Sequence, residues 1–178
     1  MAPVILNVRR RKGQHMQVLR PMTEPEYAEW LAVVIPSYAA DKVALHRWTA
    51  EEAVERAKKE YEQLLPKGLH TESNYFSAVL NGSGQTVGSL WFVEAERVGY
   101  RVAFVFDIFV KPEYRRQGHA IRALEALELE AAERGLAGIA LQVFGHNSGA
   151  RSLYSKLGYS PTNINLYKAL SAHAKSDA

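Results

Sequence analysis

Residues 107–120 read DIFVKPEYRRQGHA, and this segment decides the fold. It overlaps the end of a β-branched and aromatic run from Arg101 to Val110, which predicts a central strand covered on both faces. A helix is expected from about Gly118 to Arg134, because apolar residues recur there at helical spacing. A loop with two arginines and a glycine therefore joins a buried strand to the start of a helix.

This loop has the composition of an anion-binding site. Backbone N–H groups at a helix start bind anions, and Gly118 lets a ligand approach the backbone closely. Arg115 and Arg116 add positive charge on the same loop. Pro112 ends the pairing of the strand and leaves the backbone of 108–110 as an edge that an extended ligand can join. An ordinary strand-to-helix turn would use the same glycine, so the motif alone supports function weakly.

The remaining elements are predicted on both sides of this segment. The capping boxes Thr23-Glu-Pro-Glu26 and Thr49-Ala-Glu-Glu52 predict helices that run to about Ala40 and about Leu65. The turn Asn81-Gly-Ser-Gly84 between apolar runs predicts a hairpin. Other expected elements are strands at 16–20, 75–80, 86–94, 138–144 and 163–170 and a helix at 148–157.

Length and composition restrict the function. The 178 residues suit one α/β domain at 16–170, with a basic leader at 1–15 and a tail at 171–178. The absence of cysteine excludes disulfides, thiolate metal sites and cysteine nucleophiles, and we expect no metal. No apolar run is long enough to span a membrane, so we expect a soluble, cytoplasmic protein.

The positive charge is concentrated near the N-terminus. The net charge is +3, yet Arg9, Arg10, Arg11, Lys12 and Arg20 lie in a segment without acidic residues, and the remainder is slightly acidic. A folded body that grips nucleic acid would carry its basic residues over one face, so nucleic acid is not the expected partner. A nucleic-acid binder that uses only the leader would lose its affinity steeply with salt.

A second motif follows at Asn147-x-x-Ala150-x-x-x-Tyr154-x-x-x-Gly158. The spacing places its first three residues on one side of a short helix, and Gly158 ends that helix. In isolation such residues usually form a capped surface helix with a core tyrosine. A dinucleotide site is disfavoured, because Gly118 lacks the two earlier glycines of the Gly-x-Gly-x-x-Gly loop.

Both motifs together, in this order, resemble the GNAT superfamily of N-acetyltransferases over roughly Met16 to Leu170. Arg115-x-x-Gly118-x-Ala120 matches the coenzyme A signature of the superfamily, and the second motif extends to Gly158-Tyr159. The sequence N-terminal to the two motifs resembles a poorly characterised bacterial branch of this superfamily. The residues that carry this resemblance are Tyr38-Ala-x-Asp41, Trp48 and Leu64-Leu-Pro-x-Gly68.

The resemblance implies a mixed, mostly antiparallel sheet flanked by helices, in which the strand 101–110 splays from 138–144. Acetyl-CoA, as co-substrate, would enter that split and give its acetyl group to a primary amine by direct transfer in a ternary complex. A homodimer is also implied, with the strand 163–170 available to pair across a two-fold axis. The implied cofactor-binding residues are Ile108, Phe109, Val110, Arg115, Arg116, Gln117, Gly118, His119, Ala120, Asn147, Ala150 and Tyr154.

The reaction needs a neutral amine, a donor for the new oxyanion and a proton or hydrogen bond for the departing thiolate. The Val110 amide is a candidate for the oxyanion, and Tyr154 for the thiolate, since a phenol stays protonated at neutral pH. Asp107 is the only carboxylate on its strand and is the candidate base, acting through a water. Glu94 or His146 could share or replace it, and a chain of solvent waters could remove the proton instead, leaving proximity to supply most of the rate.

The acceptor pocket is expected between the two N-terminal helices and the loop at 69–74. Its candidate residues are Tyr38, Asp41, Trp48 and Glu94, with Tyr27 and Trp30 also available. A carboxylate near aromatic rings suits a cationic amine, which leaves a polyamine, an amino sugar, a lysine side chain and a peptide N-terminus open. The alternative function is a non-catalytic module that binds acyl-CoA as a sensor or partner, which would not need Tyr154.

Overall fold

The computed structural model describes residues 17–97, 99–145, 147–166 and 168. These residues form two compact units, one ending at Leu141 and the other beginning at Gln142. The expected leader at 1–15 and tail at 171–178 lie outside the described residues.

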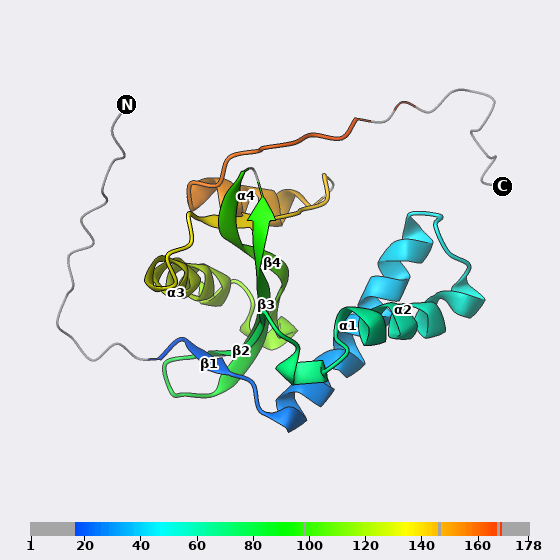
Figure 1. The fold of residues 1–178 in the computed structure, drawn as a ribbon, viewed down its shortest axis with the longest axis horizontal. Coiled ribbons are helices and arrows are strands. Elements are labelled where there is room, and N and C mark those ends of the chain that lie inside the picture. Colours follow the sequence, from blue (N-terminus) through cyan, green and yellow to red (C-terminus); the bar gives the residue numbers. More distant parts are fainter. Residues whose placement is uncertain (1–16, 98, 146, 167, 169–178) are drawn as a thin grey trace. The chain divides into compact units, whose positions relative to one another are not determined.

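The first unit is built around a sheet whose strands follow the order β1-β2-β3-β4-β5 (Figure 1). Neighbours from β1 to β4 pair antiparallel, and β5 pairs parallel to β4, which confirms the mixed, mostly antiparallel class. The strand expected at the sheet centre, β4, lies one place from it, because β3 occupies the middle. The strands are β1 Leu19–Pro21, β2 Asn74–Leu80, β3 Thr86–Arg97, β4 Tyr100–Val110 and β5 Ile139–Leu141.

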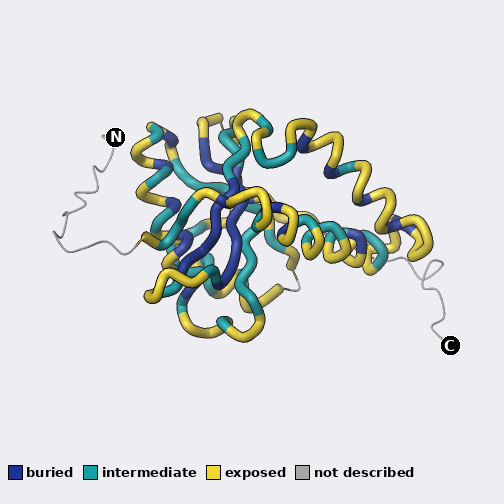
Figure 2. The backbone as a smooth tube through the Cα atoms, turned by 90° about the horizontal axis from the view of Figure 1, so that it is seen from below, coloured by how far each residue is buried: buried dark blue, intermediate teal, exposed yellow. Residues whose placement is uncertain are grey.

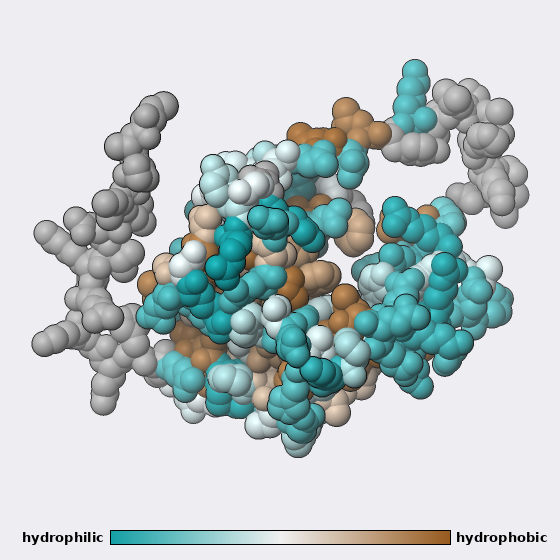
Figure 3. Space-filling view, in the orientation of Figure 1, coloured by the Kyte–Doolittle hydropathy of each residue, from teal (hydrophilic) through white to brown (hydrophobic). Residues whose placement is uncertain are grey.

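Two helices cover one face of the sheet. Helix α1 spans Glu24–Ala44 and helix α2 spans Ala50–Leu64. The predicted capping box at Thr23 is formed: its hydroxyl accepts from the Glu26 N–H, and the Glu26 carboxylate accepts from the Thr23 N–H at 2.9 Å. The box predicted at Thr49 was wrong, because the Thr49 side chain makes no capping bond. The outer surfaces of α1 and α2 are mostly hydrophilic (Figure 3).

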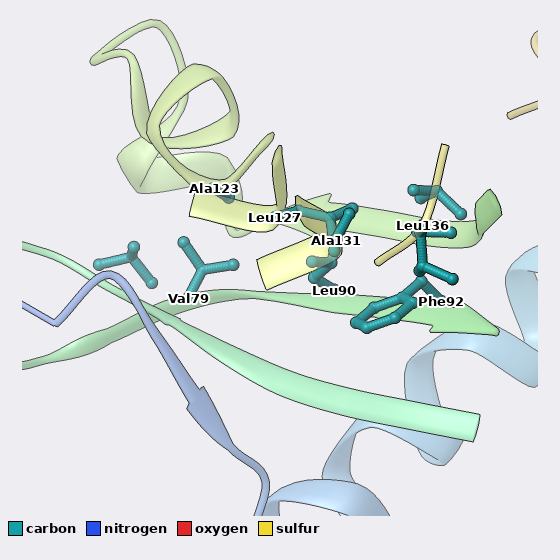
Figure 4. Close-up of a cluster of buried hydrophobic side chains, with 10 residues drawn as sticks. Val79, Leu90, Phe92, Ala123, Leu127, Ala131 and Leu136 are labelled. Carbon is teal, nitrogen blue, oxygen red and sulfur yellow. The ribbon is translucent and has the colours of Figure 1, made fainter. Parts of the chain in front are cut away.

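Helix α3, His119–Glu133, covers the opposite face, and the buried residues follow the strands between the two helical layers (Figure 2). The core under α3 joins apolar side chains of β2 to β4 to Ala123, Leu127 and Ala131 of the helix (Figure 4). The core under α1 and α2 is mostly aromatic and includes Trp30 and Trp91. We call these two sides of the sheet the α3 face and the α1 face.

A β-bulge at Phe106 changes the course of β4. Trp91 of β3 pairs with Asp107, whereas its neighbour Phe92 pairs with Val105, so Phe106 is the extra residue. The side chains of Phe106 and Asp107 therefore point to the same α1 face, where the Phe106 ring stacks on Trp91 at 4.6 Å. The bulge also marks the end of parallel pairing, since the last pair of β4 and β5 is Val105 with Leu141.

The second unit contains helix α4, Ser148–Lys156. Gly158, at a φ of +86°, follows the helix, and the Tyr159 N–H donates to the Tyr154 carbonyl, which confirms the predicted stop. The strand expected at 163–170 was wrong, because residues 163–166 and 168 lie outside any strand and the others are not described. The strand-pairing surface expected for a dimer is thus not formed in the described part of the chain.

Candidate active site

The Asp107 carboxylate lies inside the aromatic layer of the α1 face. Its Oδ2 accepts a hydrogen bond from Trp30 Nε1 of α1 at 2.9 Å. No described group donates to its Oδ1, and that atom is not sealed from solvent. Burial raises the pKa of Asp107 above its usual range, and the bond from Trp30 opposes this shift. One oxygen of this carboxylate is hydrogen-bonded, the other is accessible to solvent, and its pKa is raised. Such a carboxylate is suited to accept a proton near neutral pH.

Aromatic rings form the wall around this carboxylate. Trp30 and Trp91 meet edge to face at 5.4 Å, and Tyr61 of α2 contacts both rings at 6.1 Å. Burial first, and the charge of Asp107 second, raise the pKa of Tyr61, which therefore stays a neutral phenol. The low polarity of this wall is the cause of the raised pKa of Asp107.

The loop at the start of α3 has a backbone shaped for an anion. Arg116 has a φ of +61° and Gly118 a φ of +78°, so two residues of this loop adopt the left-handed conformation. Such alternation turns successive N–H groups into a concave nest for anions. A left-handed arginine carries local strain, which proteins tend to retain at functional sites. Gly118 is the N-cap of α3 and no side chain caps this helix, so its first N–H groups remain available to a ligand.

Two arginines are held at this loop by specific contacts. Arg115 donates from Nε to the Val110 carbonyl at 3.0 Å. Arg122 Nη2 lies 2.9 Å from His119 Nδ1, and its Nη1 is 3.2 Å from the position that a Cβ on Gly118 would take. His119 is only 5% exposed, and burial followed by the charge of Arg122 lowers its pKa. A neutral His119 therefore accepts from Arg122 and keeps the guanidinium beside Gly118.

The end of β4 offers backbone donors away from β3. Lys111 N–H donates to Val87 O, and antiparallel N–H groups alternate in direction, so those of Ile108 and Val110 point to the side where β5 would continue. β5 stops before this point, at Leu141. Phe109 lies on the α1 face under the Arg115 guanidinium. Of the other expected cofactor contacts, Gln117 and Ala120 lie in the loop and the first turn of α3.

Glu94 is not brought to Asp107. Its carboxylate lies on the α3 face and accepts from Tyr75 at 3.1 Å, from Arg101 at 2.7 Å and from Arg134 at 3.3 Å. Burial acts to raise the pKa of Glu94, but the hydrogen bonds from these three partners outweigh it and lower the pKa. The charge of Glu94 is therefore balanced within its own network, on the far side of the sheet.

The other expected acceptor residues lie toward the ends of α1 and α2. Tyr38 donates from its hydroxyl to Glu60 at 2.8 Å, and its ring meets Trp48 at 5.7 Å and Tyr61 at 5.7 Å. Trp48 is buried, whereas Asp41 is exposed. Tyr61 thus links the Tyr38 cluster to the wall around Asp107, and Asp41 lies outside that wall.

The second motif keeps its expected helix. Asn147 Oδ1 accepts from the Ala150 N–H at 3.1 Å, so this oxygen caps α4, and the side-chain nitrogen can donate to a ligand. The Tyr154 ring lies 5.5 Å from that of Tyr159. His146, the alternative base, lies outside the described residues.

Sequence reasoning missed three contributors. It offered Trp30 as a pocket residue but not as the donor to Asp107, since 77 positions separate them. It did not assign Phe106, because only the bulge turns this residue to the same face as the carboxylate. Arg122 could have been found, because it lies three positions after His119 on one helix and so shares its face.

Other features of the described chain do not add to this site. A groove of about 570 Å³ lies between β1 and α3, on the side of the sheet away from Asp107. Its lining includes Leu19, Leu129 and Glu133. Within the described residues there is no cluster of three His, Asp or Glu side chains that could hold a metal ion. None of the helices in that part of the chain is long and apolar enough to cross a membrane.

Known proteins are similar to this chain in fold and in sequence. Residues 42–159 match the acetyltransferase (GNAT) family. The chain is 33% identical to YdgE, an uncharacterized N-acetyltransferase of Bacillus subtilis, over 85% of this chain and 97% of that protein. The crystal structure of YycN, another uncharacterized N-acetyltransferase of Bacillus subtilis, matches with a TM-score of 0.77 at 32% identity, over 85% of this chain and 97% of that chain.

A shorter match is to the ribosomal protein bS18-alanine N-acetyltransferase of Escherichia coli. It is 40% identical over 62 residues, which are 35% of this chain and 42% of that enzyme. The family match covers well over half of the chain, and the match to YdgE covers most of it. The chain therefore belongs to the GNAT family of acetyltransferases.

Proposed function

We propose that the protein transfers an acetyl group from acetyl-CoA to the nitrogen of a primary amine, with Asp107 as the proton acceptor. The observation that supports this most is the position of Asp107. Its open oxygen lies on the α1 face at the point where β4 leaves β5, so a base stands next to a free backbone edge. Acetyl-CoA supplies the acetyl group as a thioester, which an amine attacks only when it is neutral.

The residues of the α3 loop fit the phosphates of coenzyme A. The N–H groups from Arg116 to Ala120 would hold the pyrophosphate, and the left-handed Gly118 leaves room that a side chain would fill. Arg115 and Arg122 would supply charge, and Asn147 a further contact to the cofactor. The backbone of Ile108 to Val110 would bind the pantetheine arm as an added strand.

Each residue then has one task in the transfer. Asp107 takes a proton from the bound ammonium through a water, which leaves the amine its lone pair. The Val110 N–H donates to the oxygen on which negative charge develops. The carbon–nitrogen bond forms as the carbon–sulfur bond breaks. Tyr154 gives its proton to the sulfur that leaves and regains one from the nitrogen, which must lose its second proton to become an amide. The products are the N-acetylated amine and free coenzyme A.

The first test is isothermal titration with acetyl-CoA, coenzyme A and NADH, for the wild type and for Gly118→Trp. We expect both coenzyme A species to bind, NADH not to bind, and the substitution to abolish binding. Release of the coenzyme A thiol in the presence of a panel of amines then distinguishes an enzyme from a non-catalytic sensor. Asp107→Asn is expected to lower kcat while acetyl-CoA still binds. Absence of binding to either coenzyme A species would overturn the proposal, and binding without turnover would favour the non-catalytic sensor.

A further inference from the structure

The α1 face of β4 beside Asp107 carries aromatic rings and one carboxylate. Phe104 and Phe106 lie next to each other there, with ring centroids 5.1 Å apart and edge to face. Phe106 is 43% exposed, although its other side stacks on the buried Trp91. An apolar ring is thus open to solvent immediately beside the proposed base, because the bulge turns consecutive residues to one side.

The charges around this face restrict what can bind there. Arg97 places its guanidinium 4.8 Å from the Phe104 ring centroid, so the π face of this ring already holds a cation. A second ammonium group on an acceptor would meet this positive charge at the rim. A nonpolar group would instead meet the open ring of Phe106.

Two carboxylates of neighbouring elements are engaged away from this patch. Glu94 lies on the opposite face and is bound by Arg101 and Arg134. Glu60 accepts from Tyr38, and the Tyr61 ring lies between that pair and the rings around Asp107. The groups placed at this face are thus one carboxylate, which suits one amine, and an open apolar ring.

We infer that the acceptor is a monoamine whose amino group lies within a few bonds of an aromatic or aliphatic group, rather than a polyamine or an amino sugar. This inference rests on the proposed function. The amino group would lie at Asp107, and the apolar group would pack on Phe106. Burying that group against an exposed ring would supply binding energy that a polyhydroxylated or multiply charged acceptor does not gain.

The experiment compares 2-phenylethylamine and hexylamine with spermidine and glucosamine, by thiol release at saturating acetyl-CoA. We expect kcat/KM for both apolar monoamines to exceed that for spermidine and glucosamine by ~10-fold or more. Phe106→Ser is expected to raise KM for the apolar amines several-fold more than KM for spermidine. Tyr100→Ser is the matched control, because Tyr100 is an exposed aromatic residue at the other end of β4.

Arg97→Gln provides the converse test, since loss of the cation is expected to raise activity with spermidine. The inference would be overturned if the wild type had a higher kcat/KM for spermidine or glucosamine than for the apolar amines. It would also be overturned if the wild type turned over neither apolar amine, or if Phe106→Ser raised KM equally for all amines. Titration of each variant with coenzyme A distinguishes a failure of the proposed function from a failure of the inferred acceptor class. Failure to bind coenzyme A counts against the proposed function, whereas binding with a preference for polar amines counts against the acceptor class alone.

Discussion

Substitution of Trp30 by Phe should raise the pKa of Asp107 and shift the pH dependence of the reaction. The substitution keeps an aromatic ring in the wall but removes the N–H that donates to Oδ2 at 2.9 Å. A hydrogen bond to a charged group contributes about 1.5–3 kcal/mol. Because about 1.4 kcal/mol corresponds to one pKa unit, the pKa of Asp107 should rise by about one to two units.

The sign follows from the role of the carboxylate. Asp107 accepts a proton only when ionised, so activity falls as the pH drops through its pKa, and a higher pKa moves the acid limb of kcat/KM to higher pH. The assay is thiol release between pH 5.5 and 9.5, with a ¹³C-carboxyl NMR titration as a readout that does not depend on turnover. Trp91→Phe is the matched control, because its indole N–H donates to Asn74 rather than to Asp107.

An acid limb that stays in place in Trp30→Phe, while the NMR pKa of Asp107 rises, would show that Asp107 is not the base. An unchanged NMR pKa would instead refute the electrostatic role assigned to Trp30. Thermal unfolding of both tryptophan variants tests for a general loss of packing, which should be similar in the two proteins because both rings are buried in the same cluster.

Three further predictions concern the sheet, α1 and the loop. Gly88→Ala should lower the free energy of unfolding by about 3 kcal/mol in urea titrations, because its Cβ would lie 2.2 Å from the Phe109 carbonyl oxygen; a loss below about 1 kcal/mol would contradict this contact. Hydrogen bonding to an arginine lowers the pKa of Glu26 to about 2, so its stabilising effect should be complete above about pH 4.5 and be lost as the pH falls toward 2; Glu26→Gln should unfold with a weaker pH dependence in this window. Coenzyme A affinity should fall as the pH drops through the pKa of His119, which burial and then Arg122 lower from the ordinary value of 6.5, because protonated His119 no longer accepts from Arg122; in His119→Gln, which keeps an acceptor, titration calorimetry should show a smaller fall.

Local patterns predicted most of the fold. The hairpin at Asn81, the helix start at Thr23 and the stop at Gly158 each depend on residues within about one turn of one another, and each is formed. The capping box at Thr49 is a local prediction that failed. Glu52 could have completed the box at Thr49, but its carboxylate lies 3.8 Å from Arg56 instead.

The candidate site was predictable only in part. The loop of Arg116 and Gly118 is contiguous in sequence, and its backbone conformation is the one that an anion site needs. The wall around Asp107 combines α1, α2, β3 and β4, and nothing local in the sequence indicates that Trp30 would reach the carboxylate. Glu94 illustrates the opposite error, since it lies on the neighbouring strand but on the wrong side of the pleat.

The bulge at Phe106 has a consequence for any attempt to redesign or compare this strand. Even-numbered residues of β4 up to Phe106 point to the α1 face, whereas from Asp107 onward the odd-numbered residues do. Deleting one codon at Phe106 would restore the regular alternation, leave Asp107 opposite Trp91 on the α1 face and remove the exposed ring beside it. One position of strand length would thus decide whether a grafted copy of this strand carries an apolar ring beside its acid.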